Sequence, residues 1–115
     1  MVNEEQSVYT DDYDDGFNKF FEDIKKNPQY DSEVIKKAYD LARDAHKNQR
    51  RRSGEPYIMH PVAVAEILYK LGMDNECIVG ALLHDVVEDT QYDLDYIRKE
   101  FGDEVALLVD GVTKL

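Results

Sequence analysis

Several features that mark other classes of protein are missing from this chain of 115 residues. It contains one cysteine, Cys77, so it has no internal disulfide framework; we expect a core residue in a reducing cytoplasm. It has no apolar run of the roughly 18 to 20 residues that cross a bilayer, and its acidic N-terminus does not resemble a signal peptide. No segment alternates apolar and polar residues for long enough to predict a strand. These absences favour a helical, cytoplasmic domain with no membrane partner.

Positive charge is also scarce. The chain has 14 lysines and arginines against 25 acidic residues, a formal net charge of -11, so most of its surface should repel DNA. Residues 1–12 are acidic and show no periodicity, which predicts a flexible tail. The segment from Lys47 to Arg52 is the exception, because it holds four of the positive charges. A local basic cluster in an acidic protein suits a small polyanionic ligand, although a solvated turn can have the same composition.

The apolar residues from about residue 13 onward recur at helical spacing. Asp31 or Ser32 and Asp93 are suitable N-caps, and Gly72 and Gly102 are suitable helix ends. The expected fold is an all-α bundle of about six helices in one domain, residues 13–115. Its second helix is expected to run to about residue 49, with a buried stripe of apolar residues: Val34, Ala38, Leu41, Ala42 and Ala45.

The last expected helix is apolar along one side. It carries Val105, Leu108, Val109 and Val112, and no later helix in the sequence is available to cover them. Exposed apolar surface of this kind promotes association. We therefore expect the chain to associate with itself through this helix, or to leave the helix mobile.

The chemistry is concentrated in the C-terminal half of the helix expected at 75–89. Residues four apart stack on one face of a helix, so His84 should lie over Glu88, and Asp85 over Asp89. Together they form a polar flank beside the apolar stripe. The flank predicts a cluster of metal-type ligands, but a hydrogen-bonded core histidine followed by a solvated helix end would give the same pattern.

A second histidine, His60, begins the preceding expected helix directly after a turn. Packing of these two neighbouring helices could bring His60 close to His84. Two imidazoles and one carboxylate suit Mn²⁺, Fe²⁺, Co²⁺ or Zn²⁺, and such an ion lowers the pKa of water. The acidic residues one turn later could take up the proton, and the basic cluster could hold phosphate. Spacing alone thus permits hydrolysis of a phosphate ester without requiring it.

Several ordered segments resemble one known family. They are Ala45-His46, Gln49, Arg52-Ser53-Gly54-Glu55-Pro56-Tyr57-Ile58, His60-Pro61, the run from Ala81 to Thr90, and the run from Val109 to Leu115. Over about residues 31–115 the chain resembles the N-terminal hydrolase domain of the RelA/SpoT homologue family, enzymes of the stringent response that make and degrade guanosine tetra- and pentaphosphate.

This resemblance implies the fold of the HD superfamily and a site that binds one Mn²⁺. The implied reaction removes pyrophosphate from the ribose 3′ position of guanosine tetra- or pentaphosphate. The implied site residues are the metal ligands His60, His84 and Asp85, the catalytic acids Glu88 and Asp89, and the nucleotide contacts Arg51, Arg52 and Ser53. His46 also matches a family position, and we expect it to be a buried structural histidine.

Two parts of the family pattern have no counterpart here. A fourth metal ligand, an aspartate in a later helix, would lie after Leu115, as would the synthetase domain that gives the family the name GTP pyrophosphokinase. We therefore expect a C-terminally incomplete hydrolase domain. The alternatives are a non-catalytic nucleotide-binding or regulatory module and another HD metal enzyme, such as an iron oxygenase. The Arg-Ser-Gly-Glu-Pro-Tyr segment and the Glu-Asp pair argue against the oxygenase.

Overall fold

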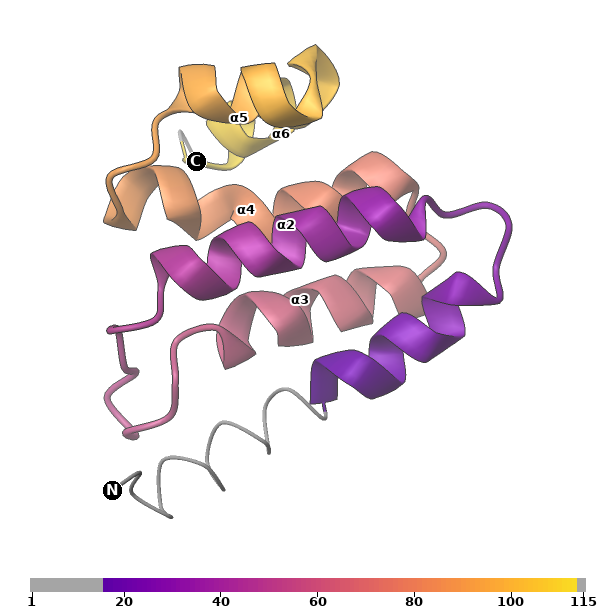
Figure 1. The fold of residues 1–115 in the computed structure, drawn as a ribbon, viewed down its shortest axis with the longest axis horizontal. Helices are drawn as coiled ribbons and strands as arrows, with labels where there is room; N and C mark the ends of the chain where they lie inside the picture. The colour runs from indigo at the N-terminus through magenta and orange to yellow at the C-terminus, as the bar shows by residue number, and fades with distance from the viewer. Residues whose placement is uncertain (1–15, 114–115) are drawn as a thin grey trace.

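The computed structural model describes residues 16–113, which form six helices and no strand (Figure 1). The all-α expectation is confirmed, and the acidic tail expected at residues 1–12 lies outside the described part of the chain. None of the described helices combines the length and apolar character needed to cross a bilayer. The helices are a first one at 16–25, α2 (Ser32–Ala45), α3 (Met59–Lys70), α4 (Asn75–Asp89), α5 (Leu94–Phe101) and α6 (Asp103–Thr113).

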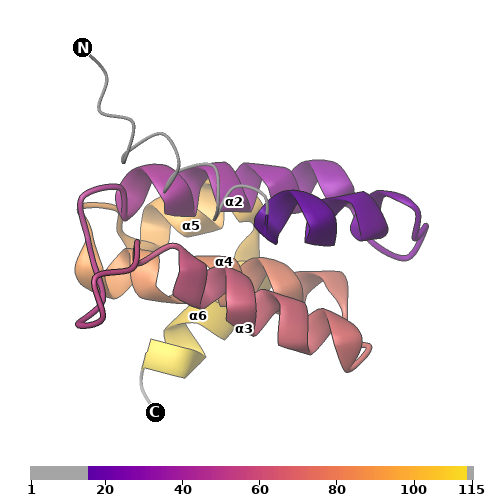
Figure 2. The same cartoon turned by 90° about the horizontal axis from the view of Figure 1, so that it is seen from below.

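Helix α4 occupies the centre of the bundle. It packs against α2, α3 and α6, while α5 packs against α6 (Figures 1 and 2). A helix with neighbours on three sides buries much of its circumference, so its apolar residues lose nearly all contact with water. Those with no exposed surface are Ile78, Val79, Leu82, Leu83 and Val86. The polar residues beside this stripe are consequently held at the junction between helices.

Side-chain carboxylates begin three of the helices. Asp31 accepts a hydrogen bond from Val34 N, and Asp93 accepts one from Tyr96 N, as their positions in the sequence predict. Asp74 does the same for α4, with its Oδ1 3.0 Å from Cys77 N. Each cap satisfies a backbone N–H that has no partner inside its helix, which stabilises the helix by about 0.5–2 kcal/mol.

The buried face of α2 differs from the predicted one. Val34 and Leu41 are only partly buried, whereas Ile35 and Tyr39 are almost completely enclosed. The cause is aromatic packing from the first helix: the ring of Phe17 stacks on that of Tyr39 with centroids 3.6 Å apart. Because α2 contacts this helix as well as α4, its buried face is centred about one residue further along than the aliphatic spacing indicates.

The expectation of an uncovered apolar face on α6 is wrong for two of its four residues, Val105 and Val109. Val105 and Val109 are 3% and 0% exposed because α6 turns back onto α4 after Gly102, whose φ of +98° permits the sharp reversal. The side chain of Val112 lies outside the described residues. Among the leucine and valine side chains of α6 that the structure describes, Leu107 is exposed, at 72%, and Leu108 is partly buried. Helix α4 thus covers Val105 and Val109, and self-association through the rest of this face stays a prediction.

The crossing of α6 over α4 leads to a prediction about Gly80. This glycine is buried in α4, and a Cβ added to it would meet Leu108 Cβ at 3.6 Å, an ordinary van der Waals distance. Gly80→Ala should therefore stabilise the fold by about 0.4–1 kcal/mol, because alanine restricts the unfolded chain without a clash. Urea unfolding measures the change. Ala63→Gly on the exposed side of α3 is the reciprocal control and should lower stability by about 1 kcal/mol. Marked destabilisation by Gly80→Ala would contradict the packing described.

Candidate metal centre and basic loop

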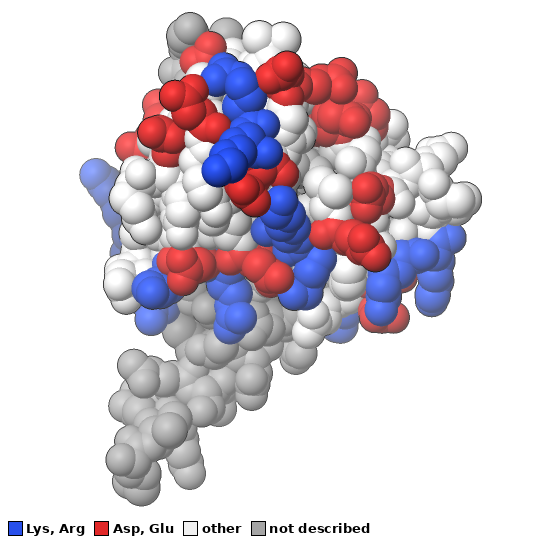
Figure 3. Space-filling view, turned by 45° about the horizontal axis from the view of Figure 1, so that its top comes forward, with Lys and Arg blue, Asp and Glu red and all other residues white. Residues whose placement is uncertain are grey.

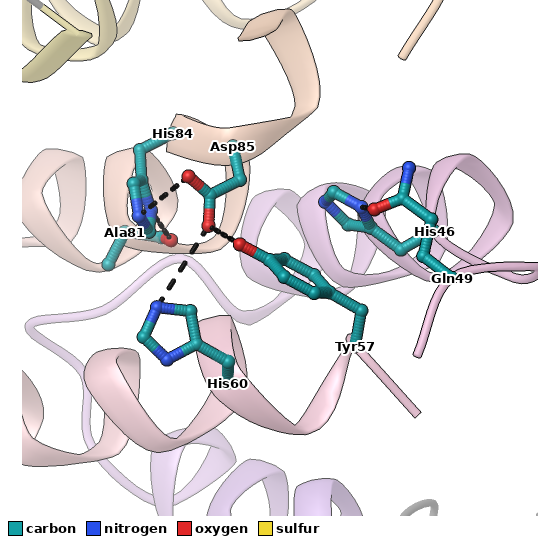
Figure 4. Close-up of polar contacts among 7 residues, drawn as sticks. All are labelled: His46, Gln49, Tyr57, His60, Ala81, His84 and Asp85. Atoms are coloured by element: carbon teal, nitrogen blue, oxygen red, sulfur yellow. Dashed lines mark hydrogen bonds and ion pairs between the residues drawn. The ribbon is translucent and has the colours of Figure 1, made fainter. Parts of the chain in front are cut away.

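Two helices bring three metal-type side chains together. His60 extends from the first turn of α3, while His84 and Asp85 extend from the C-terminal half of α4 (Figure 4). One ligand atom from each lies within 4.8 Å of the others. Among the side chains that the structure describes, which do not include that of Asp89, this is the one group of three histidine, cysteine or acidic residues close enough to hold a metal ion. The predicted approach of His60 to His84 is thus confirmed.

The hydrogen bonding of His84 makes Nε2 the ring nitrogen that is available to bind a metal ion. Its Nδ1 lies 2.8 Å from the carbonyl oxygen of Ala81. A carbonyl can only accept, so Nδ1 donates, and in the neutral ring the lone pair is then on Nε2. That Nε2 lies 3.2 Å from Oδ1 of Asp85, another acceptor, and both side chains are less than one-fifth exposed. Two facing lone pairs repel unless a proton or cation lies between them, so this arrangement fits a metal ion.

The environment of His60 also favours a neutral imidazole. Its Nε2 lies 3.9 Å from Oδ2 of Asp85. Partial burial is the main cause that lowers the pKa of His60 below its usual 6.5, although Asp85 acts in the opposite direction. The positive charge of Arg51 lowers the pKa further, with smaller contributions from His84 and His46. At neutral pH the His60 ring is therefore unprotonated and able to act as a ligand.

This lowered pKa can be measured in the metal-free protein. We expect the ring resonances of His60 to titrate with a midpoint below 6.5 in NMR spectra. As the pH falls, His60 is therefore protonated at a higher pH in the unfolded chain than in the folded chain. The contribution of His60 to stability is consequently complete above about pH 6.5 and is lost as the pH falls towards the folded-state pKa. A midpoint at or above 6.5 would contradict the environment described here.

Tyr57 is a site residue that the sequence analysis did not single out. Its hydroxyl donates to Oδ2 of Asp85 at 2.5 Å (Figure 4). Tyrosines are common in this chain, and none of the local patterns distinguishes this one from the other seven. The available signal was its place in the Arg-Ser-Gly-Glu-Pro-Tyr segment, three residues before His60.

The basic residues lie on a narrow loop between α2 and α3. Helix α2 ends at Ala45, earlier than predicted: the chain turns at residues 46–49, where Gln49 N donates to His46 O, and Arg50 then forms a short antiparallel bridge with Pro56. The loop is closed by hydrogen bonds from Arg51 N to Glu55 O, at 2.9 Å, and from Gly54 N to Arg51 O, at 2.8 Å. The residues expected to contact nucleotide are all exposed near its tip: Arg51, Arg52 and Ser53. The loop lies beside the histidine cluster, because Tyr57 directly follows its bridge residue Pro56 and donates a hydrogen bond to Asp85.

The expected catalytic acids lie at the end of α4. Glu88 is exposed and follows His84 by one helical turn, as the spacing predicts. Asp89 is the last residue of the helix, but its side chain lies outside the part of the chain that the structure describes. The following residue fixes this end, because Thr90 Oγ1 donates to Val86 O at 2.6 Å. A catalytic role for the two acids remains a prediction.

His46 is a buried structural residue, as predicted. It is 2% exposed, and its Nδ1 lies 3.0 Å from Oε1 of Gln49. Its ring packs on that of Tyr57, with centroids 4.7 Å apart. His46 therefore packs against Tyr57, a neighbour of the histidine cluster, but is not itself a member of the cluster.

Cys77 lies at an apolar cavity rather than in the core proper. It is partly buried, and a hydrogen bond with Asp74, followed by burial, raises the pKa of its thiol, which makes it a poor nucleophile. The cavity has a volume of about 210 Å³ and opens between α3, α4 and α6. Its lining residues are Val64, Leu68, Cys77, Gly80, Ala81, His84 and Leu108.

Charges of both signs are interspersed over the face of the molecule in Figure 3. Lysines and arginines of the helices pair with nearby acids, so much of their charge is neutralised locally. These pairs include Lys36 with Asp40, Lys37 with Glu100 and Arg98 with Asp95. The pairing agrees with the expectation that DNA is not a partner, which stays a prediction.

Comparison with known proteins identifies relatives of this arrangement. A family model described as an HD domain matches residues 38–115. The chain is 57% identical over 81 residues to the GTP pyrophosphokinase of Streptomyces coelicolor, covering 70% of this chain and 10% of that protein. It is similar to two proteins named guanosine-3′,5′-bis(diphosphate) 3′-pyrophosphohydrolase. The one from Haemophilus influenzae is 59% identical over 75 residues (65% of this chain, 11% of the relative), and the one from Aquifex aeolicus is 49% identical over 98 residues (82% and 14%).

These matches fit the all-helical fold and the His-His-Asp cluster. The chain spans only 10% to 14% of the length of these three relatives. The family model nevertheless covers the loop, both histidine-bearing helices and α6. The chain belongs to the HD-domain family, within its RelA/SpoT group.

Proposed function

We propose that this chain is the metal-binding part of a Mn²⁺-dependent hydrolase that removes pyrophosphate from the ribose 3′ position of guanosine tetra- or pentaphosphate. It would act in the cytoplasm during the stringent response. The observation that carries the proposal is the convergence of His60, His84 and Asp85 within 4.8 Å, in a chain similar to proteins named for this activity. Those names favour this function over a non-catalytic module or another HD metal enzyme. A synthetase domain is a further proposed partner, because the Streptomyces relative is named GTP pyrophosphokinase.

His60, His84 and Asp85 would hold the metal. Two nitrogen donors and one carboxylate suit a borderline divalent ion such as Mn²⁺. The ion supplies Lewis acidity, which lowers the pKa of water and stabilises negative charge on phosphate oxygens. The protein would orient both rings for this: Nδ1 of His84 donates to Ala81 O, which directs Nε2 towards Asp85, and the lowered pKa of His60 favours its neutral form.

Glu88 and Asp89 would act as general base and general acid towards the attacking water and the leaving oxygen. One of these carboxylates accepts a proton while the water oxygen forms a bond to phosphorus. The bond from that phosphorus to the ribose 3′ oxygen breaks, a proton goes to the 3′ oxygen, and pyrophosphate is released with GDP or GTP. The exposed position of Glu88, one turn beyond His84, supports this role because the proton can pass on to solvent.

Arg51, Arg52 and Ser53 would bind the phosphate groups. Guanidinium groups form paired hydrogen bonds with phosphate oxygens, and a serine hydroxyl can donate one more. All three residues are exposed, and Arg51 is close enough to His60 to affect its pKa. A phosphate held at this tip would therefore lie beside the proposed metal ligands.

A chimera tests this function in a complete enzyme. The segment of the Haemophilus influenzae pyrophosphohydrolase that matches this chain is replaced by the residues of this chain, and release of pyrophosphate from labelled guanosine tetraphosphate is measured with and without Mn²⁺. We expect Mn²⁺-dependent release that His84→Ala abolishes. A folded chimera whose hydrolysis is unaffected by His84→Ala, or that is inactive without that substitution, would refute the proposal.

A further inference from the structure

We propose that Tyr57 is a positioning residue that sets the orientation of Asp85 in the metal centre through its hydroxyl. This inference rests on the proposed function, because it assumes that Asp85 is a metal ligand. It adds a residue outside the ligands, the acidic pair and the nucleotide contacts discussed above.

The two oxygens of Asp85 have different neighbours. Oδ1 lies 3.2 Å from Nε2 of His84, whereas Oδ2 accepts the hydrogen bond from Tyr57 at 2.5 Å. Oδ2 also lies 3.9 Å from Nε2 of His60. The Asp85 side chain is only 13% exposed, so water has little access to replace a lost donor. The tyrosine hydroxyl therefore fixes which oxygen faces which histidine.

Tyr57 is itself held from three directions. Its backbone N–H donates to the carbonyl of Gln49 at 3.0 Å. Its ring packs on His46, which is buried and hydrogen-bonded to the Gln49 side chain. On another side the ring approaches that of His60 edge-on, with centroids 5.8 Å apart. A donor restrained in this way can orient Asp85, since neither its ring nor its backbone is free to follow a rotating carboxylate.

The same contacts join Asp85 to the basic loop. Tyr57 directly follows Pro56, which pairs with Arg50 across the base of the loop. The hydroxyl of Tyr57 thus links the segment carrying Arg51 to a proposed metal ligand on α4. This link explains why a tyrosine is suited to the position: phenylalanine would preserve the packing but could not donate a hydrogen bond.

The test is Tyr57→Phe in the 115-residue chain, with Tyr69→Phe as its matched control. Tyr69 lies on α3, and its hydroxyl also donates to a carboxylate, Oδ2 of Asp23, at 2.6 Å. Asp23 is outside the histidine cluster. Each variant therefore loses one tyrosine–carboxylate hydrogen bond and keeps its ring. Mn²⁺ affinity is measured by calorimetry, the Mn²⁺ environment by electron paramagnetic resonance, and folding by thermal unfolding.

We expect Tyr57→Phe to weaken Mn²⁺ binding about 10- to 100-fold and to alter the resonance spectrum, as loss of an outer partner of a ligand does. Tyr69→Phe should change neither. Equal Mn²⁺ affinity in both variants, or an equal loss in both, would overturn the positioning role alone. If the unaltered chain does not bind Mn²⁺, or if His84→Ala binds as well as the unaltered chain, the proposed metal centre fails and this inference fails with it.

Discussion

Mn²⁺ binding is expected to be lost when Asp85 is replaced by asparagine, although the fold should remain intact. The amide has the size of the carboxylate but no charge, and its NH₂ group can donate to Nε2 of His84, which now faces Oδ1 at 3.2 Å. Asp85→Asn therefore replaces an acceptor–acceptor contact with a hydrogen bond while removing the anionic metal ligand. We expect the affinity for Mn²⁺ to fall by more than about 100-fold, beyond the effect typical of an outer partner.

The experiment compares two aspartates that differ in environment. Calorimetric titration with Mn²⁺ is carried out on Asp85→Asn and on Asp95→Asn, whose side chain is 89% exposed on α5 and lies outside the histidine cluster. Both variants lose one negative charge, so a general electrostatic effect would appear in both. Circular dichroism and thermal unfolding verify that each variant is folded. Equal Mn²⁺ affinity of the two variants would show that Asp85 is not a ligand.

The largest effect on stability is expected from Leu82→Ala. Leu82 has no exposed surface and lies on α4, the helix that α2, α3 and α6 all contact. Removing a buried leucine side chain costs about 2–5 kcal/mol, because transfer free energy is lost and neighbours on three sides cannot all close the cavity. A domain of this size is stable by about 5–15 kcal/mol, so the loss is a large part of the total.

Urea unfolding at neutral pH measures this loss. Leu107→Ala is the control, because Leu107 is 72% exposed on α6 and its truncation should change stability by less than about 0.5 kcal/mol. Similar unfolding midpoints for the two leucine variants would be incompatible with a bundle centred on α4.

The elements of the fold could be predicted well because their signals are local. A helix end depends on a few adjacent residues, so the carboxylate caps at Asp31 and Asp93 and the positive φ at Gly72 agree with the sequence. The bounds of α4 were predicted correctly for the same reason. The candidate ligands were named partly from spacing within α4 and partly from a resemblance to known hydrolases.

Other features depend on contacts between distant segments. The face of α2 was misjudged because Phe17, on another helix, packs against Tyr39. The packing of α4 against α6 was not predicted, because helical spacing identifies an apolar face but not the neighbouring helix that covers it.

The sequence by itself determined that the chain is helical, where the capped helices begin, and that two histidines and an aspartate are available as ligands. Only the tertiary structure decided that the three side chains meet, because packing of α3 on α4 sets their separation. It also fixed the proton of His84 on Nδ1 and brought the hydroxyl of Tyr57 to Asp85. Helical periodicity specifies the direction of a side chain from its own axis, whereas the geometry of a metal centre depends on the relative position of two axes and a loop.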